Sequence, residues 1–323
     1  MPREPSGVRR LSRPASRPLL VVVGHASRDL VADDPRGWRL GGSVAYVSLT
    51  AARLGIAVRA LIGLDGESAE ASELGLLHGA GVELAPNVFA SAPVFRNVET
   101  PHGRRQQCLG VGPRLNPREV PEAWREADAW ALVPVLDELS GGGWARLPAR
   151  DATVALGWQG LLREARAGGP TRSRPPTADP LLERADVTVV SADDLDGVSM
   201  VDLVAHKGLT PLFPRRGQEL VMTDAVRGGW LMVRSTRGWD IVPYDAAVAD
   251  PELDQTGAGD VFLAAYLVTA LDDTLLPPHR PAERPFFRLR VAAVAAAMSI
   301  EGPGITAIPA RAALQERLAR AAG

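Results

Sequence analysis

The stretch Asp254-Gln255-Thr256-Gly257-Ala258-Gly259-Asp260 runs directly into the apolar segment Val261 to Val268. Small residues that open a helix let backbone N–H groups approach an anion, and the positive end of the helix dipole favours the negative charge. Asp260 would lie in the first turn, where an ionised carboxylate can accept the proton of an attacking hydroxyl. The pattern predicts an anion cradle beside a general base, as phosphoryl transfer requires. Taken alone, it also suits an ordinary glycine-rich helix start.

Short apolar runs alternate with helical segments along the rest of the chain. Leu19 to Val23 is wholly apolar and ends at Gly24, which is typical of a buried strand in a parallel sheet. The pair Gly41-Gly42 precedes small and apolar residues over Val44 to Leu54, which predicts a helix packed closely on a sheet. The alternation predicts an α/β fold with a mostly parallel sheet. We expect another helix over 68–78 and strands over 57–62, 82–84, 129–133, 153–156, 187–190 and 220–223.

Three segments interrupt this alternation. Residues 1–18 combine arginine, proline and serine without an apolar core, so we expect a disordered leader and a folded domain over 19–323. Within residues 87–112, two extended stretches flank the turn-like Thr100-Pro101-His102-Gly103, which predicts a β-hairpin. That hairpin is either a small lid or an ordinary surface hairpin. Residues 165–180, with four prolines, are expected to form a flexible loop.

The composition limits the classes of partner. Of 323 residues, 46% are hydrophobic and 23% charged, which is typical of a globular protein with a substantial core. The formal net charge of -2 provides no overall positive field for nucleic acid or an anionic membrane, and no apolar run reaches the roughly 18 residues of a membrane span. The one cysteine, Cys108, excludes disulfide frameworks and multi-cysteine metal sites and fits a cytoplasmic location.

Several familiar signatures are missing from the sequence. The single lysine, Lys207, is followed by Gly208, which excludes a Walker A loop. Gly24 to Asp29 lacks the G-x-G-x-x-G pattern of a Rossmann dehydrogenase, and the chain has no G-x-S-x-G motif. The five histidines form no i, i+4 pair, which disfavours a zinc site. The glycine-rich segment before Val261 therefore stays the strongest candidate for a site.

Four motifs that follow one another in the family's order resemble the ribokinase/PfkB family of carbohydrate kinases, over about residues 20 to 310. The family's C-terminal signature, D-T-x-G-A-G-D, is similar to 254–260, with Gln255 at the usual threonine. Its N-terminal glycine pair and closing glycine are similar to Gly41-Gly42 and Gly55. A strand, a glycine and a sugar-binding aspartate resemble Gly24 to Asp29, and the T-x-G-x-x-G nucleotide loop resembles Thr223 to Gly228. Joint occurrence is far more specific than any single motif.

The resemblance implies a role for each matching residue. Asp260 would be the catalytic base, and the backbone of Gly257, Ala258 and Gly259 would form the anion hole. Asp194 lies in Ser191-Ala192-Asp193-Asp194, where the family usually has N-x-x-E, and would position magnesium through water, although the tetrapeptide also suits a helix N-cap. The remaining implied contacts are Asp29, Gly41, Gly42 and Tyr46 with the acceptor, and Thr223, Gly228 and Thr256 with the nucleotide.

Departures from the family pattern bear on the acceptor. Ser191, Ala225 and Gln255 replace the usual asparagine, glycine and threonine, and Tyr46 stands where many sugar kinases have asparagine. Plant-type inositol kinases and their bacterial relatives also lack that asparagine, and their opening segments look closer to this one than those of ribokinases do. Tyr46 would present a flat face to a six-membered ring, which favours a cyclitol. Drift at one position of a divergent paralogue is the alternative.

Together, these features predict a ribokinase-like three-layer α/β/α fold with a small β lid. The resemblance implies an ATP-dependent, Mg²⁺-requiring kinase that phosphorylates a hydroxyl of a small sugar or cyclitol, with myo-inositol favoured. Kinases of ribose, fructose, 2-keto-3-deoxygluconate or adenosine are alternatives, as is a catalytically weak regulator that binds sugar or nucleotide. No nucleic-acid or membrane partner is expected, and a homodimer is compatible with the resemblance.

Overall fold

The computed structural model of the protein describes residues 17–100, 103–195 and 208–320. Most of the expected leader over residues 1–18 lies outside the described residues, as do Pro101 and His102 of the expected hairpin turn. No helix in the described ranges is long and apolar enough to cross a membrane.

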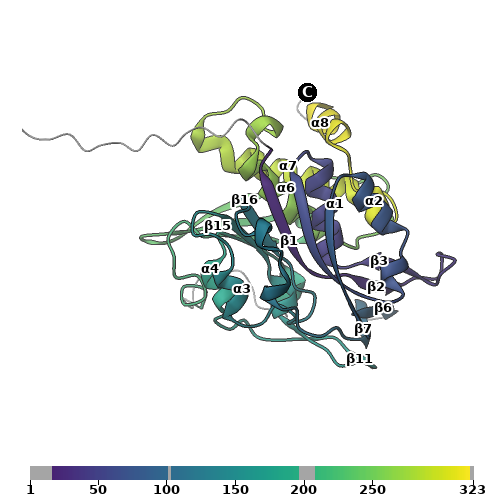
Figure 1. The fold of residues 1–323 in the computed structure, drawn as a ribbon. Coiled ribbons are helices and arrows are strands. Elements are labelled where there is room, and N and C mark those ends of the chain that lie inside the picture. The colour runs from purple at the N-terminus through teal and green to yellow at the C-terminus, as the bar shows by residue number, and fades with distance from the viewer. Residues whose placement is uncertain (1–16, 101–102, 196–207, 321–323) are drawn as a thin grey trace, which may run out of the picture.

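A central sheet forms the middle layer, and in the described part of the chain it has nine strands in the order β16-β15-β14-β13-β9-β8-β1-β4-β5 (Figure 1). From β14 to β5 every neighbouring pair is parallel, whereas β15 and β16 add an antiparallel edge. The strands are β1 (Leu19–His25), β4 (Ala57–Asp65), β5 (Glu83–Phe89), β8 (Ala129–Leu132), β9 (Thr153–Gly157), β13 (Val187–Ser191), β14 (Glu219–Thr223), β15 (Gly229–Ser235) and β16 (Gly238–Tyr244).

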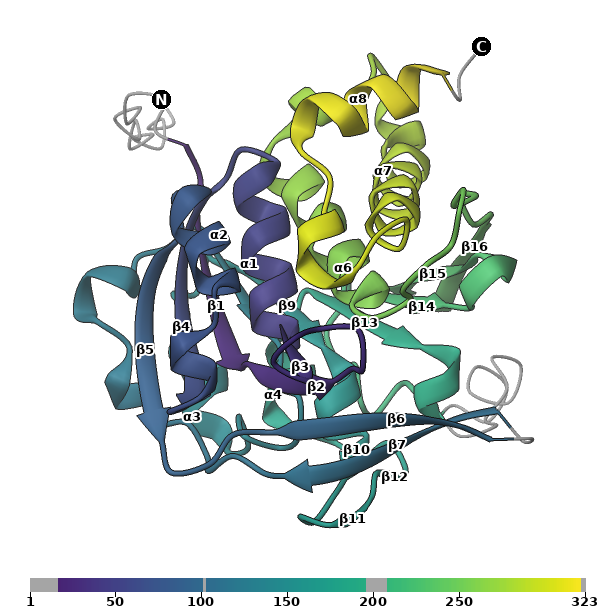
Figure 2. The same ribbon diagram turned by 90° about the vertical axis from the view of Figure 1, so that its right-hand side faces the viewer.

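Helices cover both faces of this sheet, which gives three layers (Figures 1 and 2). One face carries α1 (Ser43–Arg53), α2 (Glu73–Gly79), α6 (Ala258–Leu271), α7 (Arg284–Ser299) and α8 (Arg311–Arg320), and the other carries α3 (Gly142–Arg146) and α4 (Pro180–Arg184). Short 3-10 helices lie in the connections: η1 (Ser68–Glu70), η2 (Pro117–Glu119), η3 (Glu122–Trp124), η4 (Trp158–Leu161), η5 (Ala192–Leu195), η6 (Ala225–Arg227), η7 (Asp273–Leu275), η8 (Pro281–Glu283) and η9 (Gly304–Ala307).

Strand β1 shows why its apolar run is continuous. Leu20 and Val22 face the core under α1 and α6, whereas Val21 and Val23 face the second core, which contains residues of α3 and α4. Successive side chains of a strand point to opposite faces, so a sheet covered on both sides buries every residue of its central strand. Burial of each such side chain contributes roughly 1.5–3 kcal/mol to the driving force for folding.

A second, smaller sheet lies across one end of the central sheet (Figure 2). Its order is β11-β7-β6-β2-β3, and β6 pairs with β7 antiparallel, with Thr100 opposite Gly103 as expected for the hairpin. Strand β2 follows β1 almost immediately, so the chain passes from one sheet to the other at Ala26. The strands are β2 (Ser27–Leu30), β3 (Trp38–Gly41), β6 (Val94–Thr100), β7 (Gly103–Gly110) and β11 (Gly169–Pro170), and β10 (Arg163–Glu164) pairs separately with β12 (Arg172–Ser173).

Two expected elements differ in detail from the structure. The helix expected over 68–78 is divided into η1 and α2, because Ala71 between them has an extended ψ of 129°. Side-chain hydrogen bonds between Asp65 and Ser68 hold the preceding turn, and such local bonds compete with helix formation. The loop expected over 165–180 contains the short strands β11 and β12, and β11 extends the second sheet beside β7.

Candidate active site

The glycine-rich segment does form the start of α6, and its two glycines are needed for different reasons. Gly257 has a left-handed φ of 79°, and a Cβ on it would lie 2.2 Å from Cδ1 of Tyr46. Both the backbone conformation and the neighbouring ring therefore require glycine at this position. Gly259 is exposed, and a Cβ there would meet nothing within 4 Å. The approach to the first N–H groups of α6, which have no partner within the helix, is thus open on the Gly259 side.

Asp254 holds the loop that leads into α6. Its Oδ1 accepts from the Thr256 backbone N–H at 3.0 Å, and its Oδ2 accepts from that of Gly304 at 3.1 Å. Burial alone would raise the pKa of Asp254, but the hydrogen bonds from Thr256 and Gly304 and the charge of Arg39 lower it. Asp254 is therefore an ionised carboxylate that holds the loop before α6 in place. The sequence motif, in which Asp254 is the first residue, did not predict this role.

Asp260, in the first turn of α6, is a partly buried carboxylate with a perturbed pKa. Burial raises the pKa of Asp260 to about 6, a hydrogen bond from Ser43 and the charge of Arg163 act in the opposite direction, and Asp194 and Asp29 raise it further. Ser43 is the first residue of α1, which lies beside α6 (Figure 2). A carboxylate with a pKa near neutrality is suited to general base catalysis, because it is ionised above pH 6 yet basic enough to take a proton.

The predicted acceptor-side residues Asp29, Gly41 and Gly42 lie together. Ser27 donates to Oδ1 of Asp29 at 2.9 Å, and a Cβ on Gly41 would lie 2.1 Å from Oδ2 of Asp29. Gly42 has a φ of 88°, and its Cβ would lie 2.5 Å from the His25 carbonyl oxygen. The glycine pair is therefore required by close approach of the β3–α1 turn to the end of β1 and to the Asp29 carboxylate.

Arg163, a residue that the sequence motifs did not single out, contributes a positive charge beside Asp194 and Asp260. Its Nη2 lies 2.8 Å from Oδ1 of Asp194, and Gln159 donates to the same oxygen at 3.3 Å. Its Nη1 donates to Oε1 of Gln106, on β7 of the second sheet, at 3.4 Å. Asp194 is only 7% exposed, so its charge is balanced locally by this guanidinium.

Asp194, at the position where the resemblance implies that magnesium is positioned through water, already has side-chain partners. Its carboxylate is occupied by Arg163 and Gln159, and the described residues contain no group of three or more histidine, cysteine, aspartate or glutamate side chains that could hold a metal. The hydroxyl of Ser191 accepts from the Asp193 N–H at 3.3 Å, which is the capping arrangement that was the alternative for this tetrapeptide.

The expected nucleotide loop lies at the same edge of the sheet. Thr223 ends β14 and is paired in register with Ser191 at the end of β13. Gly228 has a φ of 84°, and a Cβ on it would lie 2.0 Å from the Tyr244 carbonyl oxygen. Ala225 has a φ of 46°, in the left-handed region that favours glycine. This backbone conformation explains why the motif usually has glycine at this position.

Tyr46 is placed between the two halves of the site. It is 2% exposed, its ring lies against Gly257, and burial, followed by the charges of Asp29, Asp254 and Asp260, raises its pKa well above the usual value. The charges of these three carboxylates therefore all act on the tyrosine hydroxyl. Part of the Tyr46 ring lies against Gly257, and contact of Tyr46 with an acceptor stays a prediction.

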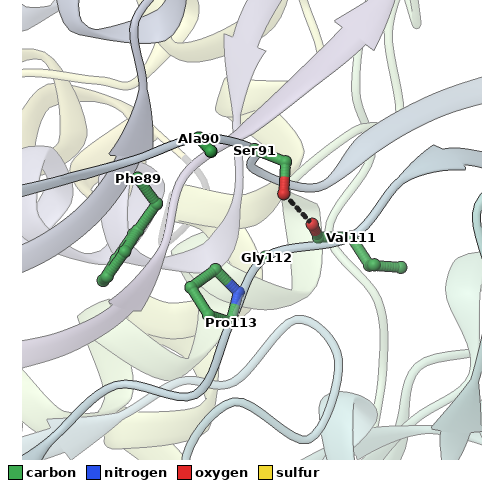
Figure 3. Close-up of a pocket in the computed structure, with 6 residues that line it drawn as sticks. All are labelled: Phe89, Ala90, Ser91, Val111, Gly112 and Pro113. Atoms are coloured by element: carbon green, nitrogen blue, oxygen red, sulfur yellow. Dashed lines mark hydrogen bonds between the residues drawn. The ribbon is translucent and has the colours of Figure 1, made fainter.

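A pocket of about 370 Å³ lies where β5 and β7 end (Figure 3). Its walls come from two short segments, and the Ser91 hydroxyl donates to the Val111 carbonyl oxygen between them at 2.8 Å. None of the predicted site residues lines it. The lining residues are Phe89, Ala90, Ser91, Val111, Gly112 and Pro113.

The layers, the strand order and the small second sheet define a ribokinase-like α/β/α fold, as the sequence predicts. The candidate site combines Asp260 with an open helix start, the Asp29 carboxylate and the Arg163–Asp194 pair.

Solved structures with this fold cover nearly the whole chain. A ribokinase from Giardia lamblia has a TM-score of 0.70 at 15% identity, and a fructokinase with bound ATP from Xylella fastidiosa has a TM-score of 0.68 at 20% identity; each alignment covers 94% of this chain and 99% of that chain. A pyrophosphate-dependent kinase in the ribokinase family, complexed with a pyrophosphate analog and myo-inositol, has a TM-score of 0.68 at 18% identity, with 93% and 99% covered. No protein-family model and no curated protein matches the sequence.

Proposed function

We propose that the protein is a kinase that transfers the terminal phosphoryl group of ATP to a hydroxyl of a small sugar or cyclitol. The observation that carries the proposal is Asp260, a carboxylate with a pKa of about 6 in the first turn of α6, beside the open approach at Gly259. A general base next to a set of backbone N–H donors is the minimum that phosphoryl transfer needs, because positioning and charge stabilisation supply most of its catalysis.

In the proposed reaction, Asp260 accepts the proton of the acceptor hydroxyl as its oxygen attacks the γ-phosphorus. A new oxygen–phosphorus bond forms, the bond between the γ-phosphorus and the bridging oxygen breaks, and ADP leaves. Backbone N–H groups of Gly257, Ala258 and Gly259 would donate to the transferring group, and the dipole of α6 would favour its charge. Thr256 contributes through its hydrogen bonds to Asp254, which hold the loop in place.

The proposed acceptor lies against Asp29, with Gly41 and Gly42 as close backbone neighbours. A carboxylate accepts hydrogen bonds from adjacent hydroxyls of a furanose or a cyclitol alike, so Asp29 selects polyols without choosing between rings. We favour myo-inositol, supported by the resemblance of the opening segment and by the fold neighbour that was complexed with that compound. Tyr46, beneath Gly257, would act through its hydroxyl or by supporting the cradle.

Exposed apolar side chains support a nucleotide rather than pyrophosphate as the donor. Val226 and Val248 are 78% and 79% exposed, on the loop before β15 and on the segment after β16. These segments are neighbours, because a Cβ on Gly228 would lie 2.8 Å from the Ala246 backbone nitrogen. Apolar groups beside the Thr223–Gly228 loop would suit an adenine ring, for which pyrophosphate has no counterpart.

The test is turnover by purified protein with either ATP or pyrophosphate in the presence of Mg²⁺. The acceptors are myo-inositol, ribose, fructose, 2-keto-3-deoxygluconate and adenosine, and the readout is ADP or phosphate release confirmed by detection of the phosphorylated acceptor. We expect turnover with ATP, highest kcat/KM for myo-inositol, and loss of turnover in Asp260→Asn. Binding of acceptor or nucleotide without any turnover would favour the regulator instead. Higher kcat/KM for another acceptor would correct the substrate while leaving the kinase in place.

A further inference from the structure

Arg163 brings a fixed positive charge into a site that is otherwise rich in carboxylates. The charges of Asp29 and Asp194 act on Asp260, and the charge of Arg163 acts on it in the opposite sense. A transferring phosphoryl group would add further negative charge at this place. Three carboxylates and a phosphate require a compensating cation, since like charges at short range in a partly buried site repel strongly.

The surroundings of Arg163 hold its guanidinium in one orientation. Asp194 accepts from Nη2 at 2.8 Å, and Gln106 accepts from Nη1 at 3.4 Å. Asp194 is itself fixed by Gln159 and by its place in η5. A guanidinium has five N–H donors in a planar fork, and these two contacts engage two of them, so others can donate to phosphate oxygens.

We propose that Arg163 is a catalytic residue that binds the transferring phosphoryl group, and that Asp194 orients Arg163 instead of ligating a metal. This proposal rests on the proposed kinase function. It explains why the carboxylate at the expected magnesium position is paired with an arginine, and why that arginine is linked to the second sheet through Gln106. The positive charge would lie close to Asp260, where the new oxygen–phosphorus bond forms.

The competing explanation is that Arg163 only neutralises a buried Asp194. Removal of one partner of a buried ion pair is destabilising, so the single variant Arg163→Met alone does not separate the two explanations. The double variant Arg163→Met with Asp194→Asn removes both charges together. If the pair is only structural, the double variant regains stability and activity; if Arg163 binds phosphate, it regains stability and stays slow.

The first experiment measures binding by calorimetry without an acceptor, which separates the γ-phosphate contact from turnover. Arg163→Met is expected to bind a non-hydrolysable ATP analogue at least about tenfold more weakly, with ADP affinity within twofold of the original, because ADP lacks the transferred group. Arg172→Met is the matched control, since Arg172 is an exposed arginine on β12, the partner strand of β10. Equal weakening for both nucleotides, or none, would overturn the proposal.

The second experiment measures rates and thermal stability. We expect kcat to fall about 10²- to 10³-fold in Arg163→Met and in the double variant, the range seen when one transition-state donor is removed, with partial rescue by Arg163→Lys. Recovery of activity in the double variant would overturn the proposal.

The metal alternative is tested by Asp194→Asn, through the Mg²⁺ concentration that gives half the maximal rate. We expect that concentration to stay within twofold of the original, whereas a tenfold rise would assign Asp194 to the metal. Assays of the original protein distinguish failure of this proposal from failure of the proposed kinase function. If it neither binds nucleotide nor turns over any acceptor, both fail; if it turns over and Arg163→Met matches it, only the Arg163 role fails.

Discussion

Replacement of Ser43 by alanine tests how the pKa of Asp260 is set. The Ser43 hydroxyl donates to Asp260 and lowers its pKa against the effect of burial, so its removal should raise that pKa above about 6. A hydrogen bond to a charged group contributes about 1.5–3 kcal/mol, and one pH unit corresponds to about 1.4 kcal/mol. Asp260 is only partly buried, and water would replace some of the lost bond. We therefore expect the pKa of Asp260 to rise by about one unit, at the low end of the range that this hydrogen-bond energy allows.

The assay is the pH dependence of kcat/KM, whose acid limb follows ionisation of the base in the free enzyme. A pKa about one unit higher lowers the ionised fraction of Asp260 at pH 6 from about one half to about one tenth. Ser43→Ala should therefore lose about fivefold in kcat/KM at pH 6 and almost nothing at pH 9.

Ser48→Ala is the matched control. Ser48 is a buried serine on the same helix, and its hydroxyl has no hydrogen-bond partner among the described residues. Its acid limb should coincide with that of the original protein. An acid limb of Ser43→Ala that does not move, or that moves to lower pH, would refute the reasoning.

Three further substitutions test other parts of the site. Asp260→Asn should lower kcat by at least about 10²-fold and yet raise the free energy of unfolding at pH 8 by about 1–3 kcal/mol. The gain in stability follows because an acid whose pKa is raised on folding destabilises the folded state once the pH passes its pKa in the unfolded state. Denaturant unfolding should therefore show the gain at pH 8 and little gain at pH 4. Gly259→Val meets open space, so calorimetry should give at least about tenfold weaker ATP binding with a melting temperature close to the original, and unchanged ATP affinity would contradict the anion cradle. Ala225→Gly should leave turnover intact and stabilise the protein by up to about 1 kcal/mol, since relief of the left-handed conformation outweighs the added chain entropy; a loss of stability on urea unfolding would contradict this.

The central fold could be predicted because its signals are local. Apolar runs such as Leu19 to Val23 identify strands buried on both faces, and Gly42 and Gly257 mark helix starts through their positive φ. Strands β2, β3, β15 and β16 were not predicted. In β16, for example, Asp240 and Pro243 interrupt the apolar residues and most of the strand is exposed, and its place is set by pairing with β15.

The candidate site could be predicted only where a motif fixes its own geometry. The residues from Asp254 to Asp260 are close in sequence, so their spacing is informative. Arg163 comes after η4, far along the chain from Asp194 and Asp260, and only the packing of separate elements brings these residues together. The sequence placed Ser43 only at the start of a helix. Its position directly after a glycine pair, as the first residue of α1, was the one local signal that could have identified it as a site residue.

The contact between Tyr46 and Gly257 means that these two positions cannot vary independently. Any side chain at 257 would overlap the ring of Tyr46, and any enlargement at 46 would press on the loop that begins α6. Because the left-handed φ of Gly257 requires glycine there whatever residue stands at 46, the loop that begins α6 limits the size of the side chain at 46. A library intended to change the acceptor should randomise Tyr46 together with the residues that support the loop, since selection at 46 alone would recover mostly variants that preserve the donor side.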